Sequence, residues 1–376
     1  MKILRVSTVP LSLNLFCRGL FQELSNQGHK TIAVSSPGED LEELRIRENI
    51  KVYEVPMVRR ISPIRDFVSL LRLIKVIHRE SPDILHSITP KAGLLSMAAG
   101  TICKVPHRIH TFTGLVFPTA KGIKRRLLMF TDALTCKFAT KVHAEGRGVR
   151  NDLINFKITR KPIEILQNGS LKGVNSDYFN PSLSELQQKA NELRINGQLT
   201  FIFIGRIAKE KGINELIAGF VKINKVRPDC RLWLLGLMEN EIDPLSISTL
   251  NEIKNNNAIK YLGYQKDIRP WLLASDCLIL PSYREGFPNV VLEAGAMGKP
   301  CIVTDINGSN EIIVNNETGW IVPPKDIESL YSAMMEVMLR RNELRKIGEE
   351  ARQRVISRYN YKDVQTTLIS YYKNLT

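Results

Sequence analysis

Two short stretches in the second half of the sequence combine charged residues, glycines and a predicted helix start in ways that suit a phosphorylated ligand. The first is GRIAKEKG at 205–212, where Gly205 permits a tight turn and Arg206 and Lys211 supply two cations. An apolar run precedes this stretch and an amphipathic run follows it, so the cations lie near a predicted helix N-terminus. Helix N-termini and cations both favour negative charge, and together they suit a diphosphate. Solvated loops between strands and helices also carry Lys and Arg, so this stretch alone leaves both interpretations open.

The second stretch, residues 282–300, reads SYREGFPNVVLEAGAMGKP. Glu285 stands before a Gly-Phe-Pro turn, and a helix is predicted to begin near Pro288 or Asn289, because proline is tolerated in the first helical turn. Glu293 then lies about one turn inside this helix. Free backbone N–H groups at the helix start suit a phosphate, and the two carboxylates can accept hydrogen bonds from sugar hydroxyls. The alternative, that both glutamates are capping and surface charges, stays open on the residues alone.

Both stretches belong to a chain that alternates apolar strands with amphipathic helices. The predicted strands of the first half are 2–9, 30–36, 51–56, 83–88, 108–114 and 141–146. Those of the second half are 199–207, 231–236, 259–264, 277–282, 299–305 and 319–324. One helix is expected over 13–27 and another over 64–80. Strands separated by helices indicate parallel sheets built from βαβ units. A chain of 376 residues exceeds one usual core, so we predict an α/β protein with two Rossmann-like, doubly wound, parallel-sheet domains.

The boundary between the domains is expected near residue 175. The segment EILQNGSLKGVNSDYFNP at 164–181 is rich in Asn, Gly and Ser and ends in Pro, as a strand followed by a linker does. We therefore predict domains at 1–175 and 176–355, followed by a C-terminal helix at 356–376.

These motifs resemble the retaining glycosyltransferases of family four, which have the GT-B fold. GRIAKEKG, PSYREGFPNVVLEAGAMGKPCIVTD and NNETGWIVPP are similar to the C-terminal half of that family, and QNGSLKGVNSDYFNP is similar to its Asn-Gly…Phe-Pro junction. The similarity is specific in the second half and mainly architectural in the first. It implies two domains facing across a cleft, an acceptor domain first and a donor domain second. The segment RYNYKDV resembles the start of the family's final helix, which returns to the first domain.

The resemblance also implies roles for individual residues. Arg206 and Lys211 would hold the donor diphosphate and stabilise the leaving nucleotide, so neither a metal ion nor a cofactor is expected. Glu293 would bind the ribose, and Glu285 would face the donor sugar. The predicted donor-binding residues are Arg206, Lys211, Glu285, Gly286, Phe287, Pro288, Asn289, Val290 and Glu293. The predicted catalytic residues are Glu285, His110, Arg206 and Lys211. The nucleobase is expected near Gly263 and Tyr264.

The first half departs from the commonest family pattern in two places. The loop after the first strand, TVPLSLNLF, has none of the glycines that often approach the donor phosphate. Many members have a histidine just before the glycine of the strand that reads RIHTFTG here; this chain has Thr113 there and its histidine at His110. His110 either turns toward the donor sugar or is a buried structural histidine. Because HTFTG resembles a bacterial branch that assembles surface polysaccharides, Thr113 and Gly114 are expected on the acceptor side of the site.

The net charge of +15 belongs almost wholly to the first half. Residues 1–177 carry 28 Lys and Arg against 15 Asp and Glu, whereas residues 178–376 carry 25 against 23. The segments 57–79 and 120–141 combine many of these cations with apolar residues at helical spacing. Such helices either lie on anionic membranes or face a core with their polar side in water. A polyprenyl-diphosphate-linked acceptor, which the family implies, is anionic and membrane-bound. We therefore expect a cytoplasmic protein held peripherally on the inner face of the inner membrane.

The N-terminal stretch MKILRVSTVPLSLNLF is broken by polar residues and has no small-residue cleavage site, so we expect a strand and loop rather than a signal peptide. The six cysteines form no CxxC pair and are expected to be reduced and mostly buried. The remaining histidines show no metal-ligand spacing.

The predicted function is retaining, metal-independent transfer of a hexosyl or N-acetylhexosaminyl group. The donor is expected to be a UDP-sugar, and the acceptor a polyprenyl-diphosphate-linked saccharide of bacterial O-antigen, capsule or exopolysaccharide. One rival is a transferase of the same fold that acts on a soluble acceptor. Another is a nucleic-acid-binding protein, but only the charge favours it, so no nucleic-acid partner is expected. A sugar-nucleotide epimerase would need acid/base residues that the sequence does not identify.

Overall fold

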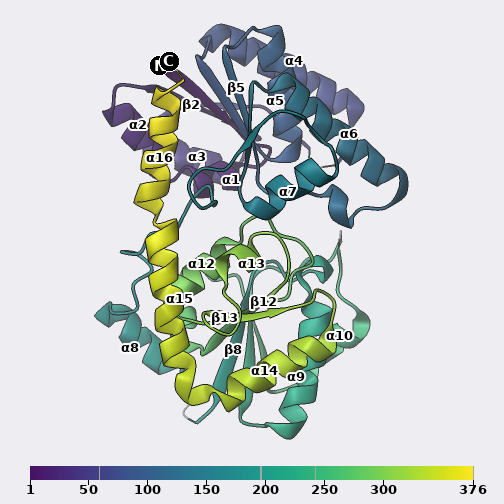
Figure 1. Ribbon diagram of the computed structural model, residues 1–376, viewed down its shortest axis with the longest axis vertical. Coiled ribbons are helices and arrows are strands. Elements are labelled where there is room, and N and C mark those ends of the chain that lie inside the picture. Colours follow the sequence, from purple (N-terminus) through teal and green to yellow (C-terminus); the bar gives the residue numbers. More distant parts are fainter. Residues whose placement is uncertain (59, 195–196, 242, 376) are drawn as a thin grey trace. The chain divides into compact units, whose positions relative to one another are not determined.

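The computed structural model describes residues 1–58, 60–194, 197–241 and 243–375, and the chain forms two compact units (Figure 1). Unit 1 comprises Met1–Lys172 and Lys362–Thr376, and unit 2 comprises Gly173–Tyr361. Each unit is built on one parallel β-sheet packed with helices, so the predicted α/β architecture with two Rossmann-like sheets is confirmed. The boundary between Lys172 and Gly173 lies just before the junction that the sequence predicts near residue 175.

Unit 1 has a seven-stranded sheet in the order β3-β2-β1-β4-β5-β6-β7, and every pair in it is parallel. Its strands are β1 (Lys2–Val6), β2 (Lys30–Ser35), β3 (Lys51–Glu54), β4 (Ile84–Ile88), β5 (His107–Phe112), β6 (Lys141–Ala144) and β7 (Ile163–Glu164). The strand order reverses between β1 and β4, where sheets of this kind bind ligands at their carboxyl edge.

Helices cover both faces of this sheet, because successive strand residues point to opposite sides. Leu4 and Val6 of β1 share a core with α4 (Pro63–Glu80), α5 (Pro90–Ile102), α6 (Gly122–Phe138) and α7 (Arg147–Asn155). Ile3 belongs to the opposite core, with α1 (Pro10–Phe16), α2 (Leu20–Asn26), α3 (Glu39–Glu48) and α16 (Tyr361–Lys373). A short 3-10 helix, η1 (Phe117–Thr119), precedes α6. The C-terminal helix therefore returns to the first domain, as the resemblance implies.

The prediction of one helix over 13–27 is wrong. α1 ends at Phe16 and α2 begins at Leu20, after Gly19, whose φ of 73° is left-handed. A left-handed residue breaks the hydrogen bonding that a continuous right-handed helix needs, and glycine adopts that conformation without strain.

A row of polar side chains crosses the sheet beneath α16. Arg5 is paired in register with His86, and Thr111 with His143. The Arg5 guanidinium donates to the Tyr372 hydroxyl of α16 at 2.6 Å, and that hydroxyl also lies 2.5 Å from His86 Nδ1. His86 Nε2 in turn lies 2.7 Å from Thr111 Oγ1. The returning helix is thus fixed by buried hydrogen bonds as well as by apolar packing.

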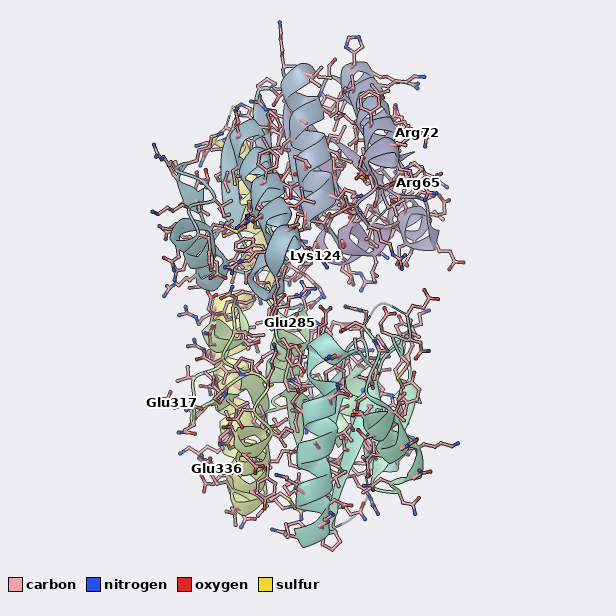
Figure 2. The ribbon with its side chains drawn as sticks, turned by 90° about the vertical axis from the view of Figure 1, so that its right-hand side faces the viewer. Arg65, Arg72, Lys124, Glu285, Glu317 and Glu336 are labelled. Atoms are coloured by element: carbon pink, nitrogen blue, oxygen red, sulfur yellow. The ribbon has the colours of Figure 1, made fainter. Side chains whose placement is uncertain are left out.

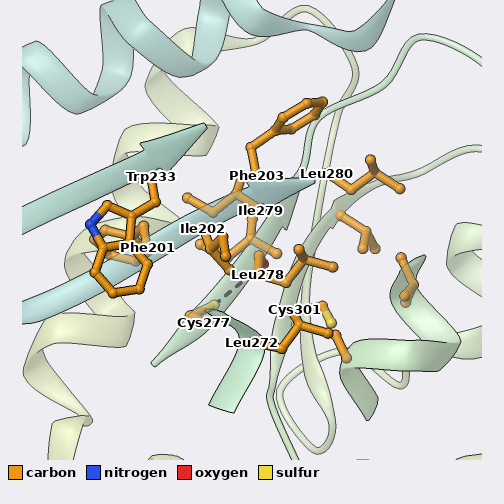
Figure 3. Packing of buried hydrophobic residues seen from close by; sticks show 14 of the residues in the cluster. Phe201, Ile202, Phe203, Trp233, Leu272, Cys277, Leu278, Ile279, Leu280 and Cys301 are labelled. Carbon is orange, nitrogen blue, oxygen red and sulfur yellow. Dashed lines mark hydrogen bonds between the residues drawn. The ribbon is translucent and has the colours of Figure 1, made fainter. Parts of the chain in front are cut away.

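Unit 2 has a six-stranded parallel sheet in the order β10-β9-β8-β11-β12-β13. Its strands are β8 (Leu199–Ile204), β9 (Cys230–Leu235), β10 (Ile259–Gly263), β11 (Cys277–Leu280), β12 (Cys301–Thr304) and β13 (Gly319–Val322). Its helices are α8 (Ser184–Leu193), η2 (Lys209–Lys211), α9 (Ile213–Val226), α10 (Ile247–Asn255), α11 (Arg269–Ala274), α12 (Asn289–Ala296), α13 (Ser309–Ile312), α14 (Ile327–Leu339), η3 (Arg341–Glu343) and α15 (Leu344–Tyr359). Side chains of the central strands, Phe201 and Ile202 on β8 and Leu278 and Ile279 on β11, fill its core (Figure 3).

All six cysteines are free thiols, and all except Cys103 are buried, in accord with the prediction. Among the described residues, no helix has both the length and the apolar character that crossing a bilayer requires. Arg59, part of the basic segment 57–79, lies outside the described residues.

Candidate active site

The GRIAKEKG stretch links β8 to α9 and is locked against the loop that follows β11. Gly212, the N-cap residue of α9, has a φ of 71°. A Cβ atom on Gly212 would lie 2.0 Å from the carbonyl oxygen of Pro281, so only glycine fits this position. Because β8 and β11 are neighbours in a parallel sheet, the two loops leave the same edge and their charged side chains meet.

Lys211 and Glu285, one from each loop, form an ion pair. The Lys211 Nζ donates to Glu285 Oε1 at 2.5 Å, and the Ser282 hydroxyl donates to the same oxygen at 2.7 Å. Figure 2 labels Glu285 among the side chains of unit 2. The structure therefore brings a cation predicted to bind the diphosphate beside the carboxylate predicted to face the sugar.

Arg206 belongs to a second charged group on the same two loops. Its guanidinium pairs with Glu210, and its Nη1 lies 3.4 Å from Glu239 Oε2. The other oxygen of Glu210 accepts hydrogen bonds from Arg284, from Nε at 3.1 Å and from Nη2 at 2.6 Å. Burial acts to raise the pKa of Glu210, but Arg284 and Arg206 outweigh it and hold the pKa below its ordinary value. Glu210 is thus ionised at neutral pH and bridges two guanidinium groups.

Glu210 and Arg284 are absent from the residues predicted from the sequence, although each stands inside one of the two motifs. They are 74 positions apart in the chain, and only the adjacency of β8 and β11 brings them together. The backbone N–H of Tyr283 also donates to the Glu210 carbonyl at 2.9 Å, and its hydroxyl donates to Glu215 of α9 at 2.7 Å. The sequence showed acidic and basic residues within both motifs, but it did not indicate which of them would pair.

The Gly-Phe-Pro turn leads into α12, which begins at Asn289 with Pro288 as its N-cap residue, as the sequence predicts. Phe287 is buried, and its ring centroid lies 5.3 Å from that of Tyr359. Glu293 follows inside α12, half-buried. The Asn289 Oδ1 is buried and has no hydrogen-bond partner among the described residues. The Phe287 ring therefore anchors the turn against Tyr359, and the start of α12 carries a buried polar atom that has no partner in the described part of the chain.

The region predicted to hold the nucleobase lies at the same edge of the sheet. Gly263 ends β10, and its carbonyl accepts a 2.8 Å hydrogen bond from the backbone N–H of Gly236 after β9. Tyr264 follows with an exposed ring. The donor-binding residues predicted from the sequence thus all belong to unit 2, on loops or a helix start that follow its strands.

His110 lies inside unit 1 and is 1% exposed. Its Nδ1 lies 2.8 Å from Ser87 Oγ, and a Cβ on Gly93 of α5 would lie only 2.4 Å from its ring. Burial lowers the pKa of His110 to about 3, so the ring is neutral at physiological pH. This is the geometry of a buried structural histidine; a catalytic role stays a prediction. Thr113 and Gly114 follow β5 and are half-buried.

Among the described residues, no three His, Cys, Asp or Glu side chains are grouped in a way that would hold a metal ion. Arg206, Lys211 and Arg284 place positive charge at the edge of the unit 2 sheet. Two Rossmann-like sheets, one with such a cluster beyond its carboxyl ends, are typical of α/β proteins that bind phosphorylated ligands.

Comparison with known proteins identifies the family. The model of the glycosyl transferases group 1 matches residues 185–354, and that of glycosyltransferase family 4 matches residues 14–170. The capsular polysaccharide biosynthesis glycosyltransferase CapM of Staphylococcus aureus is 32% identical over 99% of this chain and 96% of its own. A UDP-Gal:alpha-D-GlcNAc-diphosphoundecaprenol alpha-1,3-galactosyltransferase of Escherichia coli is 29% identical over 77% of this chain and 75% of its own. The chain belongs to glycosyltransferase family four.

The fold agrees with this assignment. The Anabaena protein HepE, solved in complex with UDP and glucose, has a TM-score of 0.82 at 16% identity and is matched over the whole of both chains. A glycosyltransferase from Rickettsia africae has a TM-score of 0.79 at 23% identity, with 100% of this chain and 98% of that chain covered. At these identities the likeness shows the fold, which is GT-B.

Proposed function

We propose that this glycosyltransferase transfers a hexosyl or N-acetylhexosaminyl group, with retention of configuration and without a metal ion or cofactor. The donor is a UDP-sugar, and the acceptor is a polyprenyl-diphosphate-linked saccharide in bacterial surface-polysaccharide biosynthesis. The observation that carries the proposal is the meeting of Lys211, Glu285 and Arg206 on adjacent loops at the carboxyl edge of the unit 2 sheet.

The charges around this edge explain how a nucleotide sugar would be held. Each cation is already paired with a carboxylate, Lys211 with Glu285 and Arg206 with Glu210. A diphosphate offers stronger anionic partners, so Lys211 would move from Glu285 to the phosphate and free that carboxylate to accept hydrogen bonds from sugar hydroxyls. As the glycosidic bond breaks, negative charge grows on the leaving nucleotide, and Arg206 and Lys211 stabilise it.

The helix start supplies the remaining donor contacts. Backbone N–H groups from Gly286 to Val290 surround the N-terminus of α12, where the first N–H groups have no helical partner and favour an anion. Glu293 lies further along the helix, where its carboxylate would accept hydrogen bonds from the ribose.

Unit 1 is the acceptor domain in this proposal, with Thr113 and Gly114 on the acceptor side. Its segments carry 30 Lys and Arg against 15 Asp and Glu, which suits an anionic, lipid-linked acceptor. The name of the Escherichia coli relative specifies such an acceptor. We place the protein peripherally on the cytoplasmic face of the inner membrane and assign it no nucleic-acid partner. His110 supports the domain from within in this proposal and takes no part in transfer.

The test is a panel of nucleotide sugars with the purified full chain, scored by donor hydrolysis and by transfer to a polyprenyl-diphosphate saccharide. Lys211→Ala and Arg206→Ala should each lower kcat/KM by about a hundredfold or more with the melting temperature unchanged, since each removes charge from the leaving diphosphate. Lys222→Ala is the matched control, because this exposed lysine of α9 pairs with Glu328 away from the two loops. Near-normal rates in both site variants would overturn the proposal.

Three readouts test the finer statements. The anomeric configuration of the product tests retention, and rates in the presence of a chelator test metal independence. A soluble sugar acceptor used as readily as the lipid-linked one would favour the alternative, a transferase of the same fold with a soluble acceptor.

A further inference from the structure

Helix α4 carries an apolar stripe that the fold leaves in solvent. Its buried face consists of Ser69, Leu73, Ile77 and Glu80. A second set, Ile64, Phe67, Val68 and Leu71, recurs at the spacing of one helical face and is exposed, Ile64 at 82% and Phe67 at 60%. A stripe of this spacing normally packs into a core. The core side of α4 is already occupied by other residues, so this stripe has no packing partner among the residues of unit 1 that the structure describes.

Helix α6 repeats the arrangement. Its buried residues are Asp132, Thr135 and Cys136. Ile123 and Phe130 are exposed at 84% and 61%, and Leu127 between them is exposed too. The two helices share no sequence motif, yet each shows an outward-facing apolar stripe.

Both stripes belong to one layer of unit 1. α4 and α6 each pack against α5, and all three helices cover the same face of the sheet. Cations stand next to these apolar residues in the sequence: Arg65 and Arg72 on α4, and Lys124 on α6, all three of which Figure 2 labels. None of these three cations forms an ion pair within the described ranges of the chain.

We propose that the outer faces of α4 and α6 form a membrane-docking surface that inserts its apolar side chains into an anionic lipid bilayer. The distribution of charge favours an anionic bilayer as the binding partner. Unit 1 carries 30 basic against 15 acidic residues, whereas unit 2 is balanced at 23 against 23, so an anionic partner prefers unit 1. Apolar side chains flanked by cations match the boundary between acyl chains and phosphate headgroups. The inference rests on the peripheral membrane attachment given in the proposed function and names the surface that would make it.

The apolar stripes alter the salt dependence of membrane binding that charge alone would predict. Adsorption by charge is lost when salt screens it. Insertion of Ile64, Phe67 and Leu71 adds burial of apolar surface, which salt does not weaken. Binding should therefore require anionic lipid to start and should survive in part at high salt.

The experiment is co-sedimentation of the purified full chain with vesicles, without donor or acceptor. Vesicles of phosphatidylcholine alone are compared with equal parts of phosphatidylcholine and phosphatidylglycerol, each at low and high salt. The chain should bind only the anionic vesicles and retain part of that binding at high salt. The double variant Phe67→Ser/Leu71→Ser should bind roughly tenfold or more weakly and lose the salt-resistant part. Arg65→Gln/Arg72→Gln should weaken binding chiefly at low salt.

The matched control is Ile247→Ser/Leu339→Ser, which removes two exposed apolar side chains of unit 2 and should bind as the unchanged chain does. Because all the substituted positions are exposed, melting temperatures should stay the same, and donor hydrolysis without vesicles should be unaltered. A double α4 variant that binds normally would overturn the proposal. The proposal would also be overturned if the unchanged chain did not bind anionic vesicles. A stable dimer that buries the stripe, detected by size-exclusion chromatography, would overturn it as well. Loss of hydrolysis in the Lys211 variant with vesicle binding intact separates this inference from the transfer function.

Discussion

The two units share one architecture and use their charges in opposite ways. In unit 2 the basic and acidic residues balance, and several of them meet on loops at the carboxyl edge of the sheet. In unit 1 the cations outnumber the anions twofold and are spread over helices, while ionisable side chains such as Arg5 and His86 are buried. A doubly wound sheet therefore does not dictate a role; the placement of charge on it does.

The histidines and tryptophans of the chain are also divided between the two units. All six histidines of the chain belong to unit 1, and all three tryptophans, Trp233, Trp271 and Trp320, belong to unit 2. Burial lowers the pKa of His86 well below its ordinary value and that of His143 to about 4. The charged side chains of the two motifs in unit 2 lie on loops at the edge of the sheet, whereas these histidines of unit 1 are buried and neutral, and protonating them would destabilise the fold.

The largest expected effect is acid destabilisation confined to unit 1. The unfolded histidines take up protons as the pH falls below about 6.5, but the folded His86, His110 and His143 do not, so stability is full above that pH and is lost below it. Burial raises the pKa of Asp132 to about 7, which offsets one of these three groups with the opposite sign. The net loss should be about 3–5 kcal/mol between neutral pH and about pH 4.5.

The measurement compares two probes in denaturant titrations at each pH. Tryptophan fluorescence reports unit 2, and far-UV circular dichroism reports both units. At acid pH the part of the circular dichroism change that reports unit 1 should occur at a lower denaturant concentration. The midpoint of the fluorescence transition, which reports unit 2, should stay the same. If both transitions move together, the contrast between the units in buried histidines is not what controls acid stability.

A smaller effect is expected from His110→Ala. The change leaves a cavity beside Gly93 and removes the nearer of the two partners of the Ser87 hydroxyl, so unit 1 should lose about 2–4 kcal/mol. Turnover by the folded fraction should change less than about tenfold, because a buried side chain supports the fold rather than the chemistry. Donor turnover at saturating ligand, normalised to the folded fraction, checks this. A fall of a hundredfold at unchanged stability would instead establish the catalytic role that the resemblance implies.

The smallest effect is expected from Glu210→Gln in unit 2. The amide keeps the shape but loses the charge that orients Arg206 and Arg284, so kcat/KM for the donor should fall about tenfold. Unfolding followed by tryptophan fluorescence should be nearly unchanged. Glu328→Gln, which removes the partner of exposed Lys222, is the control and should have no effect. An equal or faster rate would mean that Arg206 is positioned without Glu210.

Much of the fold followed from local pattern. Alternation of apolar strands and amphipathic helices is a property of neighbouring residues, and it indicated the two parallel sheets and the start of α12. The helix predicted over 13–27 was wrong because Gly19 adopts a left-handed conformation that periodicity does not reveal. The donor motifs could also be found, because glycines, cations and carboxylates cluster within short stretches.

What the sequence by itself determined was therefore the type of each element and the chemistry carried on each loop. Tertiary structure decided which of these groups meet and which face water. The bridge from Glu210 to Arg284 exists because β8 and β11 are adjacent, and His110 is buried because Gly93 lets α5 approach its ring. On α4, two apolar stripes competed for the core; Leu73 and Ile77 were buried, and Phe67 and Leu71 were left in solvent. Sequence periodicity describes a helix about its own axis, but only packing against the sheet selects the side that is buried.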